Sequence, residues 1–194
     1  MAAKEVPVPS SGSIRRPPSG RVRRWRRLRV VLAVIVVAAL AATAPLFVWP
    51  DRGMPPKADA LVSLDTDDGN LNFALRLARQ HRAPFLVISL GTPESGYGCP
   101  GPIAGVTLIC FNPSPGTTQG EAEFVGRLAR EHHWHSVAIV TITPQDTRAR
   151  LRFERCFAGP VYVVTTPVPL IYWPYQIAYE WIALTKALVL QRSC

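Results

Sequence analysis

Residues 30–49 (VVLAVIVVAALAATAPLFVW) form a run of 20 residues without a charged side chain. A helix of this length is about 30 Å long, which matches the hydrocarbon core of a bilayer. Residues 1–29 carry nine basic side chains against Glu5, a net charge of +8, and basic flanks stay on the cytoplasmic side of a membrane. The sequence therefore predicts one membrane span over residues 30–49, with a cytoplasmic N-terminus and Trp49 at the outer interface.

A cleaved signal peptide is the alternative to an uncleaved anchor. Residues 42–44, Ala-Thr-Ala, have the small-x-small pattern of a cleavage site, although Pro45 would follow the cut and the apolar run continues through Val48. Both interpretations place the rest of the chain outside the cytosol. Residues 1–29 are rich in Pro, Ser and Arg and have no hydrophobic period, so we expect them to be disordered.

The positive charge of the chain points to a membrane rather than to a nucleic acid. The whole chain has a net charge of +9, but residues 30–194 contribute only +1 of it. An Arg cluster beside a span is explained by topology and by anionic lipid, and the domain lacks the basic surface that nucleic acids require. We therefore expect a membrane as partner, no nucleic acid, and protein partners, if any, from the cell envelope.

A Pro/Gly linker over residues 50–58 leads into a predicted domain over residues 59–194. Five short apolar runs alternate there with segments of helical period, the pattern of a parallel sheet covered on both faces. The predicted fold is α/β, a Rossmann-like three-layer sandwich with a mainly parallel five-stranded sheet, behind one N-terminal transmembrane helix. The predicted strands are residues 59–64, 85–91, 106–111, 136–143 and 161–166.

The last segment, residues 172–192, is long and apolar enough to raise the question of a second span. Glu180 and Lys186 lie in its middle, and each would cost a few kcal/mol at the centre of a bilayer. We therefore predict a terminal helix that packs on the domain.

Polar side chains follow the predicted strands at their carboxyl ends, where parallel sheets bind ligands. Thr117 or Thr118 can cap the helix that begins there, and Glu121 completes a capping box with Thr118. The same helix N-terminus offers N–H groups and the positive end of its dipole to an anion. We predict a site for a small anionic or nucleotide-like ligand, lined by Asp65, Ser89, Thr117, Thr118, Glu121, Gln145 and Arg148.

Neither the acidic nor the His-rich segment has the spacing of a standard metal site. The aspartates of residues 65–68 lack the spacing of a calcium loop, and an Asp beside a helix start is usually a cap. The three histidines of residues 132–135 end a helix, where His complements the dipole, and no fourth ligand is fixed by spacing. We therefore predict no metal site, and the sequence identifies no cofactor.

Three arginines share one face of a predicted helix, opposite an apolar face. We expect Arg152 and Arg155 to form a solvated basic face. Arg148 lies in the first turn, where a cation is unfavourable beside the helix dipole. It therefore needs a compensating anion, which is either Glu121 across the cleft or a ligand.

The order of these segments resembles the YdcF-like family, also called the SanA/ElyC family or domain of unknown function 218. The most specific motifs are TTQGEA (117–122), VAIVT (137–141) and the pair Arg148-Ala149 heading a helix, and the resemblance covers residues 59–190. It implies a membrane-anchored, actinobacterial-type member with a Rossmann-like domain and a role in the cell envelope, in peptidoglycan precursor metabolism or barrier function. It implies no general reaction, although one cytosolic relative binds S-adenosylmethionine.

The chain departs from the family pattern in the turn after the first strand, which is DTDDG (65–69) instead of a Gly-rich turn, and at two further positions. Asn70 stands where members carry an Arg, and Gln145 stands where they carry a His, so a phosphate clamp and an acid/base candidate are both replaced. Whether the protein is an enzyme is therefore left open. The alternative is a non-catalytic scaffold or interaction domain of an envelope complex with a degenerate site. A serine hydrolase is a third and weaker hypothesis, because Ser89 has no Gly-x-Ser-x-Gly context.

The four cysteines are an even number in a domain predicted to lie outside the cytosol, where disulfides form. Cys99 precedes the third strand and Cys110 lies within it, so a short bridge is natural. Cys156 ends a helix, and Cys194 stays ordered if something ties it down. We predict the disulfides Cys99–Cys110 and Cys156–Cys194, with reduced core cysteines as the alternative.

Overall fold

The computed structural model describes residues 20–50, 53, 57–64, 68–91 and 98–194. Asp65, which the sequence assigns to the ligand site, lies outside the described residues. The chain divides into two compact units, residues 1–40 and residues 41–194. Each unit is described by itself.

Helix α1 (Gly20–Thr43) carries most of the predicted span and continues into a short π-helix, η1 (Ala44–Val48). Over the ranges that the structure describes, one helix, Arg23–Val48, is long and apolar enough to cross a membrane, and a signal sequence has the same properties. Residues 20–29 are helical, where the sequence predicted disorder. Arg is a good helix former, and a long helix next to it removes the cost of nucleation.

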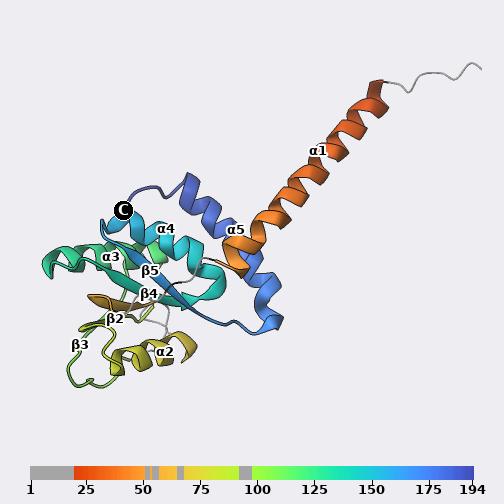
Figure 1. Cartoon of the computed structure of the whole chain (residues 1–194). Coiled ribbons are helices and arrows are strands. Elements are labelled where there is room, and N and C mark those ends of the chain that lie inside the picture. The colour runs from red at the N-terminus through yellow and green to blue at the C-terminus, as the bar shows by residue number, and fades with distance from the viewer. Residues whose placement is uncertain (1–19, 51–52, 54–56, 65–67, 92–97) are drawn as a thin grey trace, which may run out of the picture. The chain divides into compact units, whose positions relative to one another are not determined.

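The described residues of the second unit form an all-parallel sheet of five strands in the order β3-β2-β1-β4-β5 (Figure 1). The predicted α/β fold with a five-stranded parallel sheet is thereby confirmed. Because β1 lies between β2 and β4, the chain builds the sheet first to one side of β1 and then to the other. Such a switch point is where open α/β sheets bind ligands. The strands are β1 (Ala60–Ser63), β2 (Phe85–Ser89), β3 (Thr107–Phe111), β4 (Val137–Ile142) and β5 (Val161–Thr166).

Helices cover both faces of the sheet, because successive residues of a strand point to opposite faces. Ala60 and Val62 of β1 belong to a core shared with α3 and α4, whereas Leu61 belongs to a second core shared with α2 (Figure 1). This double burial explains why three successive residues of the strand, Ala60, Leu61 and Val62, are all apolar. The helices are α2 (Asp68–Arg79), α3 (Thr118–Glu131), α4 (Asp146–Cys156) and α5 (Trp173–Val189), with 3-10 turns η3 (Thr143–Gln145) and η4 (Leu170–Tyr172).

The terminal helix α5 packs on the domain, as predicted, and buries Glu180, Leu184 and Ala187. The end of the apolar N-terminal helix packs against it. Phe47 is 0% exposed, and its ring lies edge-on to the ring of Trp181, with 5.3 Å between the centroids. The second unit therefore includes residues that the sequence assigned to the membrane span.

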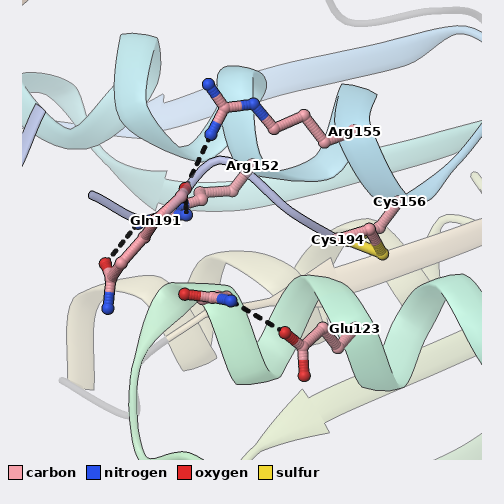
Figure 2. The surroundings of a disulfide bond; sticks show 7 residues. Glu123, Arg152, Arg155, Cys156, Gln191 and Cys194 are labelled. Atoms are coloured by element: carbon pink, nitrogen blue, oxygen red, sulfur yellow. Dashed lines mark hydrogen bonds between the residues drawn. A yellow bond between two sulfur atoms is a disulfide. The ribbon is translucent and has the colours of Figure 1, made fainter. Parts of the chain in front are cut away.

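Two arginines of α4 hold the C-terminal end of α5 (Figure 2). Arg155 donates from Nη1 to the carbonyl oxygens of Ala187 and Gln191, each at 2.9 Å. Arg152 donates to the backbone and side-chain oxygens of Gln191 and is buried. The predicted solvated basic face is therefore wrong, because cations complement the carbonyl end of a helix. Burial, with the nearby charges of Arg155 and Arg148, lowers the pKa of Arg152.

Both predicted disulfides, Cys99–Cys110 and Cys156–Cys194, are present. The first joins the loop before β3 to that strand, and the second joins the end of α4 to the C-terminus (Figure 2). Disulfides persist in oxidising compartments. Together with the apolar N-terminal helix, they indicate a domain outside the cytoplasm.

Candidate functional site

A cleft of about 540 Å³ opens at the carboxyl edge of the sheet. Its walls come from the N-terminal end of α3, from η3 and the first turn of α4, and from the first two turns of α5. The polar and charged side chains that line it are Thr117, Thr118, Glu121, Gln145, Arg148, Gln176 and Glu180, together with Tyr175 and Tyr179.

Gln145 links the end of β4 to the start of α3. The hydroxyl of Thr141 donates to Oε1 of Gln145 at 2.8 Å, and Nε2 of Gln145 donates to Oγ1 of Thr118 at 3.1 Å. All three residues are buried. The amide of Gln145 therefore bridges two hydroxyls on neighbouring elements and fixes their positions.

Arg148 forms a two-pronged ion pair with Glu180 of α5. Nε lies 2.7 Å from Oε2 and Nη2 lies 2.8 Å from Oε1, while Nη1 donates to Oγ1 of Thr118 at 2.8 Å. Glu180 is 1% exposed. The prediction that Arg148 needs a compensating anion is confirmed. The anion is Glu180, whereas the sequence had pointed to Glu121 or a ligand. The missed signal was that Glu180 is the single acidic residue of α5.

This pairing keeps Arg148 charged. Burial alone lowers the pKa of the guanidinium, but the hydrogen bonds and charge of Glu180, with smaller contributions from Tyr179 and Glu121, raise the pKa above its ordinary value. A raised folded-state pKa stabilises the fold at every pH below the ordinary pKa of arginine. The stabilisation is lost only as the pH rises through the raised pKa. Near neutral pH Arg148 therefore stays protonated, and the ion pair with Glu180 is kept.

The N-terminus of α3 faces the cleft with a single cap. Thr117 is the N-cap and accepts a hydrogen bond from the amide of Gly120 at 3.4 Å. The predicted capping box between Thr118 and Glu121 is therefore wrong, because Thr118 is already inside the helix. Its hydroxyl serves Arg148 and Gln145 instead. Glu121 is buried and lines the cleft.

The structure thus gathers Thr117, Thr118, Glu121, Gln145 and Arg148 of the predicted set around one cleft. Their role in binding a ligand stays a prediction.

Ser89, the remaining predicted site residue that the structure describes, is not among the residues that line the cleft. Ser89 is fully buried at the end of β2, and its hydroxyl has no hydrogen-bond partner in the described part of the chain. A buried hydroxyl cannot reach a substrate, which argues against a serine hydrolase. Asn70 is also buried and bonds the carbonyl of Leu64 and the hydroxyl of Thr166.

No group of three His, Cys, Asp or Glu side chains that could hold a metal occurs among the residues with a described placement. His132 is the C-cap of α3, and its ring stacks on that of Trp134 with 5.5 Å between centroids.

No family model, curated protein or solved structure matches this chain. The resemblance to the YdcF-like family therefore rests on the sequence motifs alone.

Proposed function

We propose that this chain is a membrane-anchored cell-envelope protein whose cleft binds a small anionic or nucleotide-like ligand. One observation carries the proposal: buried polar side chains from α3, η3 and α4, namely Thr118, Glu121, Gln145 and Arg148, meet at the carboxyl edge of the sheet. Burying polar side chains costs free energy unless they are hydrogen-bonded, and the hydrogen bonds of Thr118 with Gln145 and Arg148 hold these side chains in fixed positions at the cleft. The resemblance to the YdcF-like family supports a place in envelope or peptidoglycan metabolism.

The cleft offers two kinds of contact to such a ligand. Thr117 already caps the amide of Gly120, but the amides that precede it in the first turn of α3 have no acceptor within the helix and suit a phosphate or carboxylate. Tyr175 and Tyr179 stack on each other with 6.2 Å between ring centroids, and both are largely exposed at the cleft. Aromatic faces of this kind stack on nucleobases. Because Glu180 neutralises Arg148, the anionic group belongs against α3 and the flat group against the tyrosines.

An uncleaved anchor is favoured over a cleaved signal peptide by the packing around the cleavage pattern. Nε1 of Trp181 donates to Oγ1 of Thr43 at 3.0 Å, and the hydroxyl of Thr147 donates to the carbonyl of Leu46. Cutting after Ala44 would remove the first contact and free the chain end beside the second.

Ligand capture tests the proposal. Full-length protein in lipid nanodiscs is denatured, and released small molecules are identified by mass spectrometry. Calorimetric titration follows with adenosine diphosphate, uridine diphosphate and inorganic phosphate. Tyr175→Ala is expected to weaken nucleotide binding about tenfold, since stacking on one base is worth about 1–3 kcal/mol. Tyr172→Ala is the matched control, because Tyr172 is exposed and stands outside the described cleft lining.

Two results would count against the proposal. The absence of both a released ligand and binding of any of the three probes removes the ligand site. Equal binding by the Tyr175→Ala and Tyr172→Ala variants removes the stacking mode.

A scaffold with a degenerate site is the second candidate. The observation in its favour is that Glu180 already satisfies Arg148, the one cation among the described residues lining the cleft. A scaffold would keep its envelope partners in cross-linking experiments when Tyr175 is replaced by Ala and no ligand is bound.

A further inference from the structure

The outward side of α5 and η4 is an exposed apolar surface. Leu170 is 86% exposed, Ile171 80%, Ile182 73%, Leu190 76% and Val189 64%. We call these five residues the apolar face. Monomeric soluble domains rarely expose so many large apolar side chains together, and such patches mark a binding surface.

The outward side of α5 carries many apolar side chains, although Thr185 and Lys186 are also exposed on this helix. Its one acidic residue, Glu180, is buried in the pair with Arg148. Four residues of α5 at successive spacings of four, three and seven are aromatic or aliphatic and exposed: Tyr175, Tyr179, Ile182 and Val189. The exposed apolar side chains of such a helix favour apolar surroundings on its outer side.

The apolar face adjoins the point where the N-terminal helix meets the domain. Trp181 and Ile182 line the same shallow surface depression on α5. Trp181 holds Thr43 through the hydrogen bond from Nε1 and holds Phe47 through the edge-on ring contact. The last residues of the apolar N-terminal segment are therefore direct neighbours of the outward side of α5.

The apolar part of helix α1 is by itself too short to cross the hydrocarbon core of a bilayer. From Val30 to Thr43, α1 has 14 residues, which is about 21 Å of helix, short of the hydrocarbon core of about 30 Å. The missing length is supplied by residues 44–48, which pack on the domain. If the arginines before Val30 stay outside the core, residues 44–48 lie at the outer boundary of the bilayer. The parts of α5 that touch them then lie at that boundary too.

We propose that the apolar face docks in the outer-leaflet interface of the membrane. Tyr and Trp rings prefer this interface, and Trp49 and Tyr172 are exposed on the same unit. Lys186, in the last turn of α5, can extend its ammonium group to lipid phosphates while its stem stays in apolar surroundings. Because α5 also lines the cleft, docking places the cleft beside the lipid headgroups.

The inference rests on the proposed anchor and is independent of what the cleft binds. Full-length protein is reconstituted in vesicles of phosphatidylcholine and phosphatidylglycerol. A single nitroxide label is attached at Leu170→Cys or Ile182→Cys without reduction, so that the native cysteines stay in their disulfides. Arg130→Cys, at an exposed position of α3, is the control. Collision with oxygen, which concentrates in lipid, is compared with collision with a water-soluble nickel chelate.

Labels at positions 170 and 182 are expected to collide often with oxygen and rarely with nickel, and the label at 130 is expected to do the reverse. Nickel accessibility at 170 and 182 equal to that at 130 would overturn the proposal. Strong magnetic coupling between labels at 182 would also overturn it, because a second copy of the chain would then cover the face. Positions 170 and 182 lie outside the cleft lining, so ligand binding should be unchanged in both variants. A failure of membrane docking can therefore be told apart from a failure of the proposed cleft function.

Discussion

The guanidinium of Arg148 and the carboxylate of Glu180 are joined by two hydrogen bonds, Nε–Oε2 at 2.7 Å and Nη2–Oε1 at 2.8 Å, between α4 and α5. The pair fastens the terminal helix to the body of the domain and closes one wall of the cleft. Arg148, for which the sequence predicted either Glu121 or a ligand as the compensating anion, is therefore also a structural element.

Replacing Glu180 by Gln should destabilise the domain strongly. The change leaves Arg148 charged and without its carboxylate in a buried place, which typically costs about 3–5 kcal/mol. The free energy of unfolding is measured by urea titration of the full chain in detergent micelles, with circular dichroism as the signal. Glu154→Gln, at an exposed position of α4, is the matched control and should change it by less than about 0.5 kcal/mol. Equal effects of the two substitutions would mean that the Arg148–Glu180 pair contributes nothing to the free energy of unfolding.

Removing both members of the pair should cost less than the two single changes together. Arg148→Met with Glu180→Met removes both charges and keeps apolar volume, so neither partner is left unpaired. The double-mutant cycle measures the coupling energy, which we expect to favour the intact pair by about 1–3 kcal/mol. Strict additivity in the same urea titration would contradict direct coupling.

The two disulfides should differ in what they contribute. Loop-entropy arguments assign about 4 kcal/mol to the bridge Cys156–Cys194 and about 3 kcal/mol to Cys99–Cys110, because the loops differ in length. The sequence separations are 38 and 11 residues. Paired Cys→Ser variants are compared by urea unfolding, and peptide mapping of the exported protein without reduction checks the pairing. Four alkylatable thiols in that protein would contradict both bridges.

Close packing of α3 on α4 should make Gly126 intolerant of a side chain. A Cβ there would stand 2.6 Å from the carbonyl oxygen of Cys156. Gly126→Ala should therefore destabilise the domain by about 1–3 kcal/mol, the usual cost of overpacking. Gly101→Ala is the control, because a Cβ at Gly101 meets no atom within 4 Å. If both variants melt at the same temperature, the two helices are not packed this tightly.

The sheet could be predicted from the sequence because its signal is local. Strands buried on both faces are apolar at nearly every position, and β1 and β4 have this pattern. The pairing of Cys156 with Cys194 followed from the need to hold the C-terminus. The strands could be predicted from short segments alone, whereas the bridge joins residues 38 apart in sequence and could be predicted because four cysteines allow only three connectivities.

The contacts that complete the site could not be predicted, because they join segments far apart in the chain and several polar side chains could have served as the partner. Glu180 is 32 residues from Arg148, and no periodicity connects them. The solvated face expected for Arg152 failed for a related reason, since its partner Gln191 lies 39 residues away. Whether Thr117 or Thr118 is the N-cap depends on where helix α3 begins, and the two possible starts differ by one residue. Helix ends are the least certain part of any pattern.

Topology is the prediction on which the placement of the whole domain depends. The nine basic residues before Val30 against one acidic residue favour a cytoplasmic N-terminus, and the domain after the span should lie outside. A reporter enzyme that folds only outside the cytosol, fused at the C-terminus, should therefore be active, and the same reporter fused before Arg15 should be inactive. Retention of the active fusion in the membrane fraction distinguishes an anchor from a cleaved signal, because cleavage after Ala44 would release it. An inactive C-terminal fusion at normal expression would reverse the assignment. It would also remove the oxidising surroundings that the two disulfides require.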